Sequence, residues 1–329
     1  MYSSDELQQR TGQLVGAPYT TYLLNPEYEG HTPAGYRGED VQFDELDNTF
    51  HIVAIGASTT YGFGLRDVEA YPYLLENILQ DKGYNVQVTN AGIPGYTSFE
   101  LLTNFQFRIL EIEPDLVIYY GAKNDADTLF EDPGCYNNRS PLYGITTFHG
   151  LWRTEFEDIP TSVLYRYFAV NAGIMEVPND INFALEEIPV AVECLSGETY
   201  TEEELLELNQ PTFAERNMRN LIALAQFNGI DVALAELVHP MDMSQVYPDE
   251  EALIMSSARA QSVDEVNALY KQIAEEMDIP YLDTSEKFEI EPGMFWTEVL
   301  MTYDGTQQLA EIYADFLIEN DLLPPPETD

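Results

Sequence analysis

The sequence predicts an α/β fold, in which a parallel sheet carries helices on both faces and a cap is inserted after the third strand. Short apolar runs with β-branched residues alternate with amphipathic helical stretches, and this order is typical of a parallel sheet. The chain has 329 residues, enough for one such domain with a substantial insertion. Its 45% hydrophobic and 22% charged residues are an ordinary globular balance.

Each expected element ends at a recognisable signal. The run at 51–56 (HIVAIG) is short, apolar and followed by a Gly/Ser/Thr turn, as in a buried parallel strand. The helical spacing of 70–82 stops before Gly83. The other expected strands span 85–90, 115–121, 230–238 and 280–283, and the other helices span 98–112, 213–228, 262–277 and 306–319.

Two stretches fall outside this alternation. One is rich in Tyr, Gly and Pro and precedes the first strand, and the other is a long irregular connection that we interpret as an ordered cap. The acidic stretch 202–207 (EEELLE) within the cap is expected to present a solvated helix face. The expected parts are an N-terminal extension 1–48, a core 49–125 and 213–322, the cap 126–212 and a tail 323–329.

The net charge excludes several kinds of partner. The chain has 58 acidic and 14 basic residues, a formal charge of −44, and only four of the basic residues are lysines. Such a field repels nucleic-acid phosphates and anionic membranes. A lysine-poor acidic surface is typical of proteins kept soluble in high salt, and a simply acidic surface is the alternative.

The sequence contains no apolar stretch of 18 residues, so no membrane span is expected. Residues 1–12 lack the basic start and apolar centre of a signal peptide, which indicates a cytosolic protein or one whose leader has been removed. Cys135 and Cys194 are too few for a disulfide framework; one bridge and two free thiols both remain open. No Cys/His cluster suggests zinc, and we expect no cofactor.

Ligands of such sheets bind where the strands end, so the loops that follow the strands are the candidate site. Ser58 follows the first strand and stands near the start of a helical region, where an exposed hydroxyl can act as a nucleophile. Gly92 and Asn124 follow the second and third strands. The N–H groups of Ser58 and Gly92 and the amide of Asn124 would make a three-donor oxyanion hole.

These three blocks resemble the SGNH (GDSL-type) hydrolases. The blocks read IGASTTYG, NAGIPGYTS and GAKND, and HTPAGYRGEDV at 31–41 is similar to a segment that precedes the first block in many bacterial members. The resemblance implies a flavodoxin-like αβα sandwich with a five-stranded sheet, cleavage of acyl or carbohydrate-acetyl esters, and Ser58 as nucleophile. Many such members begin with a signal peptide or anchor, which favours an extracytoplasmic protein over a cytoplasmic one.

The closing motif of the family, Asp-x-x-His followed by Thr and Gly, is degenerate here. Matching Thr302 and Gly305 to the Thr and Gly puts Thr297 at the aspartate position and Leu300 at the histidine position. A serine hydroxyl is a poor nucleophile until a base accepts its proton. The sequence therefore predicts an ester hydrolase with impaired activity, and its alternative is a catalytically inactive pseudo-esterase that binds a ligand or carbohydrate.

Other histidines are candidates to replace the missing base. His239 ends the fourth strand at the correct sheet edge, and Asp242 could orient it; His149 lies in the cap. His51 starts the first strand at the wrong edge, and His31 has no positional argument.

The acids near the site are expected to have structural roles. Asp125 and Asp127 follow Asn124, and a capping or turn role is favoured over a metal site. Asp283 is expected to order the loop after the fifth strand. The expected partner is a small-molecule or carbohydrate ester, and the oligomeric state is left open.

Overall fold

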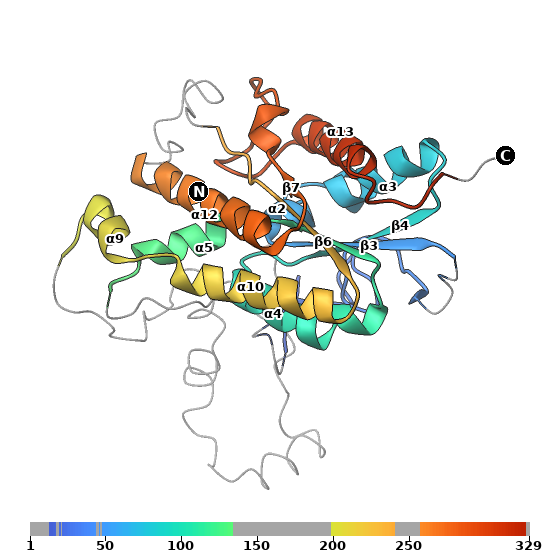
Figure 1. The fold of residues 1–329 in the computed structure, drawn as a ribbon, viewed down its shortest axis with the longest axis horizontal. Coiled ribbons are helices and arrows are strands. Elements are labelled where there is room, and N and C mark those ends of the chain that lie inside the picture. The colour runs from blue at the N-terminus through green and yellow to red at the C-terminus, as the bar shows by residue number, and fades with distance from the viewer. Residues whose placement is uncertain are drawn as a thin grey trace, which may run out of the picture.

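A computed structural model confirms the parallel five-stranded sheet with helices on both faces (Figure 1). The structure describes residues 13–17, 20, 22–43, 46, 48–133, 199–240 and 257–326. The strands are hydrogen-bonded in the order β4-β3-β5-β6-β7, and every neighbouring pair is parallel. Their bounds are β3 (Phe50–Gly56), β4 (Val86–Gly92), β5 (Leu116–Tyr120), β6 (Asp231–Ala235) and β7 (Tyr281–Leu282).

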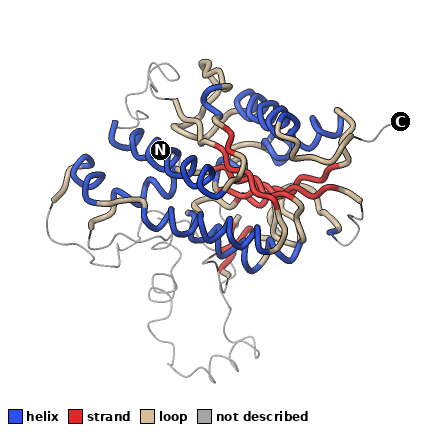
Figure 2. The backbone as a smooth tube through the Cα atoms, viewed as in Figure 1, coloured by secondary structure: helices blue, strands red, loops and turns tan. Residues whose placement is uncertain are grey.

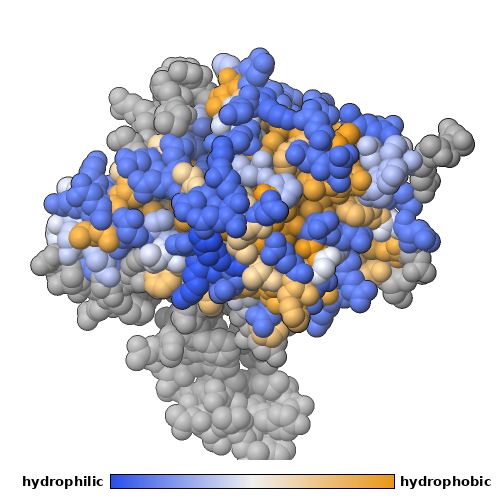
Figure 3. Space-filling model, in the orientation of Figure 1, coloured by the Kyte–Doolittle hydropathy of each residue, from blue (hydrophilic) through white to orange (hydrophobic). Residues whose placement is uncertain are grey.

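Two helical layers enclose the sheet, which lies between them in Figure 2. Helices α3 (Tyr71–Asp81) and α13 (Tyr303–Glu319) pack together on one face. On the other face, α10 (Thr212–Phe227) packs against α4 (Ser98–Phe107) and α12 (Ser257–Met277). None of the described helices is long and apolar enough to cross a bilayer. The outer face seen in Figure 3 is mostly hydrophilic, as the acidic composition requires.

The observed elements follow the sequence pattern, with differences in their bounds; α13, for example, begins at 303 rather than 306. The helix expected over 98–112 is α4 followed by a separate 3₁₀ turn, Ile109–Ile112, and α12 begins at 257 rather than 262. The strand expected over 230–238 ends early at Ala235. Beyond it, the Leu237 N–H donates to Asn267 Oδ1 and the Val238 N–H donates to the Tyr120 hydroxyl. Side chains therefore satisfy this backbone, and the segment leaves the sheet although its pattern stays apolar.

The described part of the N-terminal extension packs onto the core. Strands β1 (Leu14–Gly16) and β2 (Tyr22–Leu24) form an antiparallel hairpin. The Tyr22 hydroxyl donates to the Pro94 carbonyl at 2.7 Å, and the Arg37 N–H donates to the Asn90 carbonyl of β4 at 3.0 Å. This segment thereby covers the edge strand of the sheet beside the loop that follows β4.

The acidic stretch in the cap region forms helix α9 (Glu202–Leu208), and one of its faces is buried. Leu206 packs with Leu129 and Ala258 in a small hydrophobic cluster. The Asn209 side chain donates to the carbonyls of Leu129 and Glu131. The expectation of a solvated helix holds only for the outer face, because a leucine among the glutamates anchors the inner one.

Two glycines let the helix after β3 approach the sheet closely. This helix, α2 (Ser58–Tyr61), is one turn long and is packed against β3 and β4. A Cβ on Gly92 would overlap the backbone nitrogen of Tyr61, and a Cβ on Gly56 would overlap the Tyr120 carbonyl oxygen. Both obstacles are backbone atoms, so only glycine fits at either position.

We expect Gly92→Ala to destabilise the protein by about 3 kcal/mol, since the added methyl group must displace α2 or β4. Chemical denaturation measures this directly. Gly16→Ala is the matched control, because nothing lies within 4 Å of the added methyl group there. Equal stability losses in the two variants would contradict the close-packing explanation.

Candidate functional site

Ser58 is the first residue of α2, directly after β3 and at the carboxyl edge of the sheet. Its side chain is partly exposed and lines two small adjoining cavities. Lys123 and Asn124 line the first cavity, and Phe63 and Leu300 line the second. The structure therefore brings together residues from the first and third sequence blocks and from the closing block.

Helix α2 is held in place by neighbours on several sides. The Thr60 hydroxyl donates to the Tyr120 carbonyl at 3.2 Å, and the Asn90 amide donates to the Thr60 carbonyl at 3.0 Å. The Arg37 guanidinium lies 4.0 Å from the centre of the Tyr61 ring. These contacts fix the backbone that carries Ser58, so its position depends on the fold and not on a flexible loop.

His31 extends this clamp from the N-terminal segment. Burial lowers the pKa of His31 to about 4, so the ring is neutral near pH 7. Its Nδ1–H donates to the Asn25 carbonyl at 2.8 Å, and its Nε2 accepts from the Tyr61 hydroxyl at 2.8 Å. Nε2 holds α2 through Tyr61 and Nδ1 fixes the ring to the N-terminal segment, so both nitrogens are engaged and His31 is a positioning residue rather than a base.

Asn124 lines the first Ser58 cavity and has one amide hydrogen that no described group accepts. It lies in helix α5 (Lys123–Asp127) after β5, and its Nδ2 donates one hydrogen to the Tyr96 carbonyl at 2.8 Å. An amide nitrogen has two hydrogens, and the second has no acceptor among the described residues. The Ser58 N–H likewise donates to no described group.

Gly92 does not supply the third donor that the sequence predicted. Its N–H already donates to Asn90 Oδ1 at 3.0 Å, inside the turn that follows β4. Gly92 also lines neither cavity that contains Ser58. The residue is needed for the close packing of α2, which a sequence pattern cannot distinguish from a catalytic glycine.

The expected closing-block positions lie at the site but carry no base. Leu300 is 9% exposed and lines the second cavity with Ser58. The Thr297 hydroxyl accepts from the Leu300 N–H at 3.1 Å and closes the turn between them. Among the described residues, none accepts a hydrogen bond from the Ser58 hydroxyl. Ser58 thus lies at the sheet edge where a nucleophile was expected, and an alkyl side chain stands where its base was expected.

His239 does not replace the missing base in this arrangement. Its Nε2 pairs with Asp264 Oδ1 of α12 at 3.0 Å, and it lines neither cavity of Ser58. It follows β6, and β5 lies between β6 and β3, a lateral separation of about 10 Å. Asp264 was not singled out from the sequence because it is far from His239 along the chain.

His51 has the structural role that its position indicated. Its ring contacts the Thr89 hydroxyl at 2.8 Å and the Ile112 carbonyl at 3.1 Å. Burial lowers its pKa. His51 itself lies near the start of β3, whereas Ser58 follows the end of this strand.

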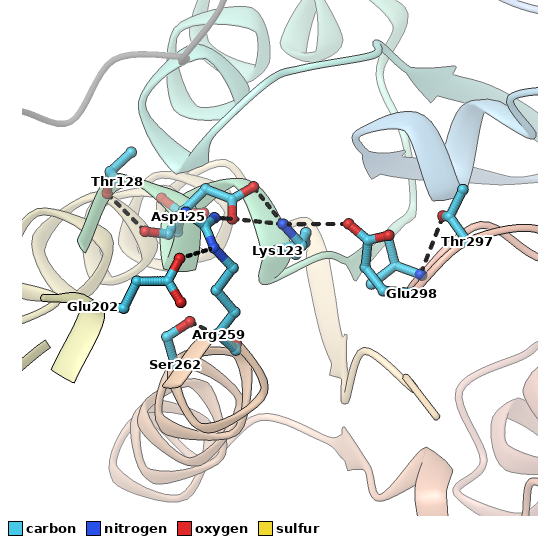
Figure 4. Close-up of polar contacts among 10 residues, drawn as sticks. Lys123, Asp125, Thr128, Glu202, Arg259, Ser262, Thr297 and Glu298 are labelled. Atoms are coloured by element: carbon cyan, nitrogen blue, oxygen red, sulfur yellow. Dashed lines mark hydrogen bonds and ion pairs between the residues drawn. The ribbon is translucent and has the colours of Figure 1, made fainter. Parts of the chain in front are cut away.

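A chain of charged side chains links the closing loop to the helices beside the site (Figure 4). The Lys123 ammonium contacts both Asp127 oxygens at 2.5 and 2.6 Å and lies 3.8 Å from Glu298 Oε1. Arg259 of α12 contacts Asp127 at 3.3 Å and Glu202 of α9 at 2.7 Å. Because the Lys123 nitrogen donates to a carboxylate, it is not available to accept the Ser58 proton.

Asp125 acts as a buried cap, as expected. Its carboxylate accepts from the Ser98 N–H at 3.1 Å and the Ser98 hydroxyl at 2.7 Å, at the start of α4. It also accepts from the Tyr270 hydroxyl of α12 at 3.0 Å. Burial raises the pKa of Asp125 to about 6, against these stabilising hydrogen bonds. No group of three metal-ligating side chains occurs in the part of the chain that the structure describes.

Asp283 was expected to order the loop after β7, but its carboxylate accepts from Lys271 Nζ of α12 at 2.5 Å and makes no side-chain cap to the 3₁₀ turn Thr284–Glu286 that follows. The predictions for Cys135, Cys194, His149 and Asp242 concern positions outside the described residues.

We expect Asp125→Asn to change how stability depends on pH. Since folding raises this pKa from 3.8 to about 6, the native state binds the proton more tightly than the unfolded state. The contribution of Asp125 to the free energy of unfolding therefore falls by about 3 kcal/mol between pH 4 and pH 6 and is constant above that range. An asparagine at this position cannot titrate. The free energy of unfolding, measured by urea denaturation, should therefore fall less between pH 4.5 and pH 7 in the variant than in the wild type.

Asp81→Asn is the control for this experiment, because it removes one carboxylate from an exposed position. A stability difference between the wild type and Asp125→Asn that stays constant with pH would contradict the assigned role of Asp125.

Comparisons with known proteins give one family match and several similar solved structures. The model of the GDSL-like Lipase/Acylhydrolase family matches residues 54–305. Among curated proteins, none matches the chain. Similar solved structures include the lipase/acylhydrolase from Enterococcus faecalis, at 15% identity over 85% of this chain and 99% of that chain, with a TM-score of 0.47.

Two further structures are similar at comparable levels. A catalytic mutant of an acetylxylan esterase from Geobacillus stearothermophilus is 14% identical over 81% of this chain and 93% of that chain, with a TM-score of 0.48. A GDSL-like lipase from Bacteroides thetaiotaomicron VPI-5482 is 14% identical over 82% of this chain and 89% of that chain, with a TM-score of 0.43. Identities of this size do not define a substrate.

Proposed function

The chain belongs to the GDSL-like lipase/acylhydrolase family, and from this membership we propose that it is an ester hydrolase with slow turnover. Ser58 is the nucleophile, and its substrate is a small-molecule or carbohydrate ester. The observation that carries the proposal is that Ser58 and Asn124 line one cavity at the carboxyl edge of the sheet.

In the proposed reaction, Ser58 Oγ attacks the acyl carbonyl and the carbonyl oxygen becomes an oxyanion. The Ser58 N–H and the second hydrogen of Asn124 Nδ2 stabilise that charge. The alcohol leaves with a proton from solvent as the tetrahedral intermediate collapses, and water then hydrolyses the acyl-enzyme to the carboxylic acid and the free Ser58 hydroxyl. The Tyr96 carbonyl accepts the other hydrogen of Asn124 Nδ2 and so holds the amide at a fixed angle. This contact preorganises the donor.

Turnover is slow in this proposal because solvent must accept the Ser58 proton. A well-placed general base contributes ~10²–10⁴-fold to such a step, and Leu300 has no group that accepts a proton. A serine hydrolase that lacks its base keeps the part of its rate enhancement that the oxyanion donors supply. In the proposed reaction those donors remain.

Leu300 also supports a second candidate function, a pseudo-esterase that binds an ester or carbohydrate without cleaving it. An alkyl side chain beside the serine is suited to ligand contact, because it is apolar and nearly buried. The two candidates differ in whether Ser58 contributes to turnover.

We expect wild-type protein to hydrolyse p-nitrophenyl acetate slowly and Ser58→Ala to lose that activity. Butyrate ester and molar salt serve as parallel conditions, since the acidic surface affects solubility. Steady-state rates measured by absorbance decide between the candidates. Identical rates for wild type and a folded Ser58→Ala variant would favour the binding function and exclude the hydrolase.

We expect Thr297→Asp combined with Leu300→His to raise kcat/KM by at least ~10²-fold, because the imidazole would line the cavity of Ser58. An aspartate at 297 would still accept from the backbone N–H of residue 300, as Thr297 does, and its other oxygen could orient the ring. The measurement is the p-nitrophenyl acetate rate of each variant.

Thr297→Asp with Leu300→Asn is the matched control, since asparagine is polar but is not a base at neutral pH. A gain of the same size in this control, or a gain that persists when Ser58→Ala is added, would count against the assigned positions.

A further inference from the structure

A cleft of about 720 Å³ opens beside the Ser58 cavities, and its volume is in the range of ligand sites. The cleft and the second Ser58 cavity share three lining residues, Phe63, Leu65 and Leu300. Leu300 thus lies between the nucleophile and the larger space. A molecule with an ester group at Ser58 would extend past Leu300 into this cleft.

Aromatic rings from three separate segments line the cleft. Tyr28 comes from the N-terminal segment, Tyr61 and Phe63 from α2 and the loop after it, and Trp296 from the closing loop. The centres of the Tyr61 and Phe63 rings are 6.4 Å apart, and the Trp296 residue is 50% exposed. A tryptophan half exposed in a cleft leaves apolar ring surface available to a ligand.

Polar side chains stand among these rings. Gln13, Glu29, Arg66 and Asp67 line the same cleft, and Arg37 lies on its inner side over the Tyr61 ring. A sugar ring presents C–H groups on its faces and hydroxyl groups on its edges, so it matches aromatic surfaces bordered by polar groups. A fatty acyl chain would cover these charged groups without pairing them, which is costly.

The charge of the protein limits the choice further. A formal charge of −44 repels polyanions, and within the cleft the two acidic residues Glu29 and Asp67 are balanced by two arginines, so the cleft itself has no net formal charge. A neutral ligand avoids this repulsion.

We propose that this cleft binds a neutral oligosaccharide, the alcohol part of an ester whose acyl group reaches Ser58. Trp296 is the stacking platform, and the N-terminal segment forms the opposite part of the site through Tyr28 and Gln13. The inference deepens the proposed function and rests on it for the acyl group, but binding in the cleft needs no turnover and is tested separately.

The test is titration of the protein with cellohexaose, xylohexaose and maltohexaose, followed by calorimetry and by fluorescence. The sequence has two tryptophans, so Trp152→Phe leaves Trp296 as the single reporter. We expect a saturable change in Trp296 emission with at least one of these sugars. Octanoate tests the acyl-chain alternative and should give no saturable change.

Variants then locate the site by calorimetry. Trp296→Ala should weaken binding about tenfold or more, and Trp296→Phe should restore most of it because a ring remains. Phe227→Ala is the matched control: this aromatic is 87% exposed at the end of α10 and outside the lining of the cleft, and its loss should change nothing.

The outcomes separate the two proposals. Sugar binding that Trp296→Ala abolishes in a protein without Ser58-dependent hydrolysis would support the cleft and overturn the hydrolase. Ser58-dependent hydrolysis with no sugar binding, with binding of octanoate alone, or with equal binding by wild type and Trp296→Ala would overturn the cleft proposal and leave the hydrolase standing.

Discussion

The close contact between helix α2 and the sheet is the constraint on which the site depends. Gly56 and Gly92 have no side chains, and for this reason one turn of helix fits against the ends of β3 and β4. Ser58 begins that turn, so its position is set by backbone packing. The clamp from His31 and Arg37 on Tyr61 secures the same turn from outside. A segment that looked like a terminal extension therefore contributes to the placement of Ser58.

The alternating pattern of the sequence predicted the sheet and its helices. Those predictions succeed because apolar runs and helix stops are local signals that burial reinforces. The early end of β6 was not predictable in this way. Its continuation stays apolar, yet Asn267 and Tyr120 take the hydrogen bonds that a strand would have made. Contacts of this kind depend on residues distant in sequence.

In the candidate site too, some features were predictable from local sequence and others depend on contacts between distant residues. Ser58 and Asn124 could be identified from their loops, and the structure brings them to one cavity. The sequence analysis assigned Gly92 a donor role. A glycine after a strand can be required either for close packing or for ligand contact, and the sequence alone does not separate these two roles. Two sets of contacts could not be predicted from local sequence, because they join separate elements. They are the pairing of His239 with Asp264 and the chain of charges through Lys123, Asp127 and Arg259.

The degenerate closing block is where sequence and structure agree most usefully. The spacing placed Leu300 at the histidine position, and Leu300 does line the cavity of Ser58. Thr297 keeps the backbone turn that supports this residue, since its hydroxyl accepts from the Leu300 N–H. The geometry of the block is thus retained while its proton-transfer groups are absent. The slow chemistry proposed for Ser58 rests on this arrangement.

The reactivity of Ser58 toward diisopropyl fluorophosphate tests the central claim most directly, because this reagent labels serines that a neighbouring base activates. Intact mass and peptide mapping after a fixed incubation give the extent and position of labelling. The missing base predicts little adduct on the wild type under conditions that label Ser58 fully in the variant carrying Thr297→Asp and Leu300→His. Rapid, complete labelling of Ser58 in the wild type would contradict it and show that a base outside the described residues activates the serine.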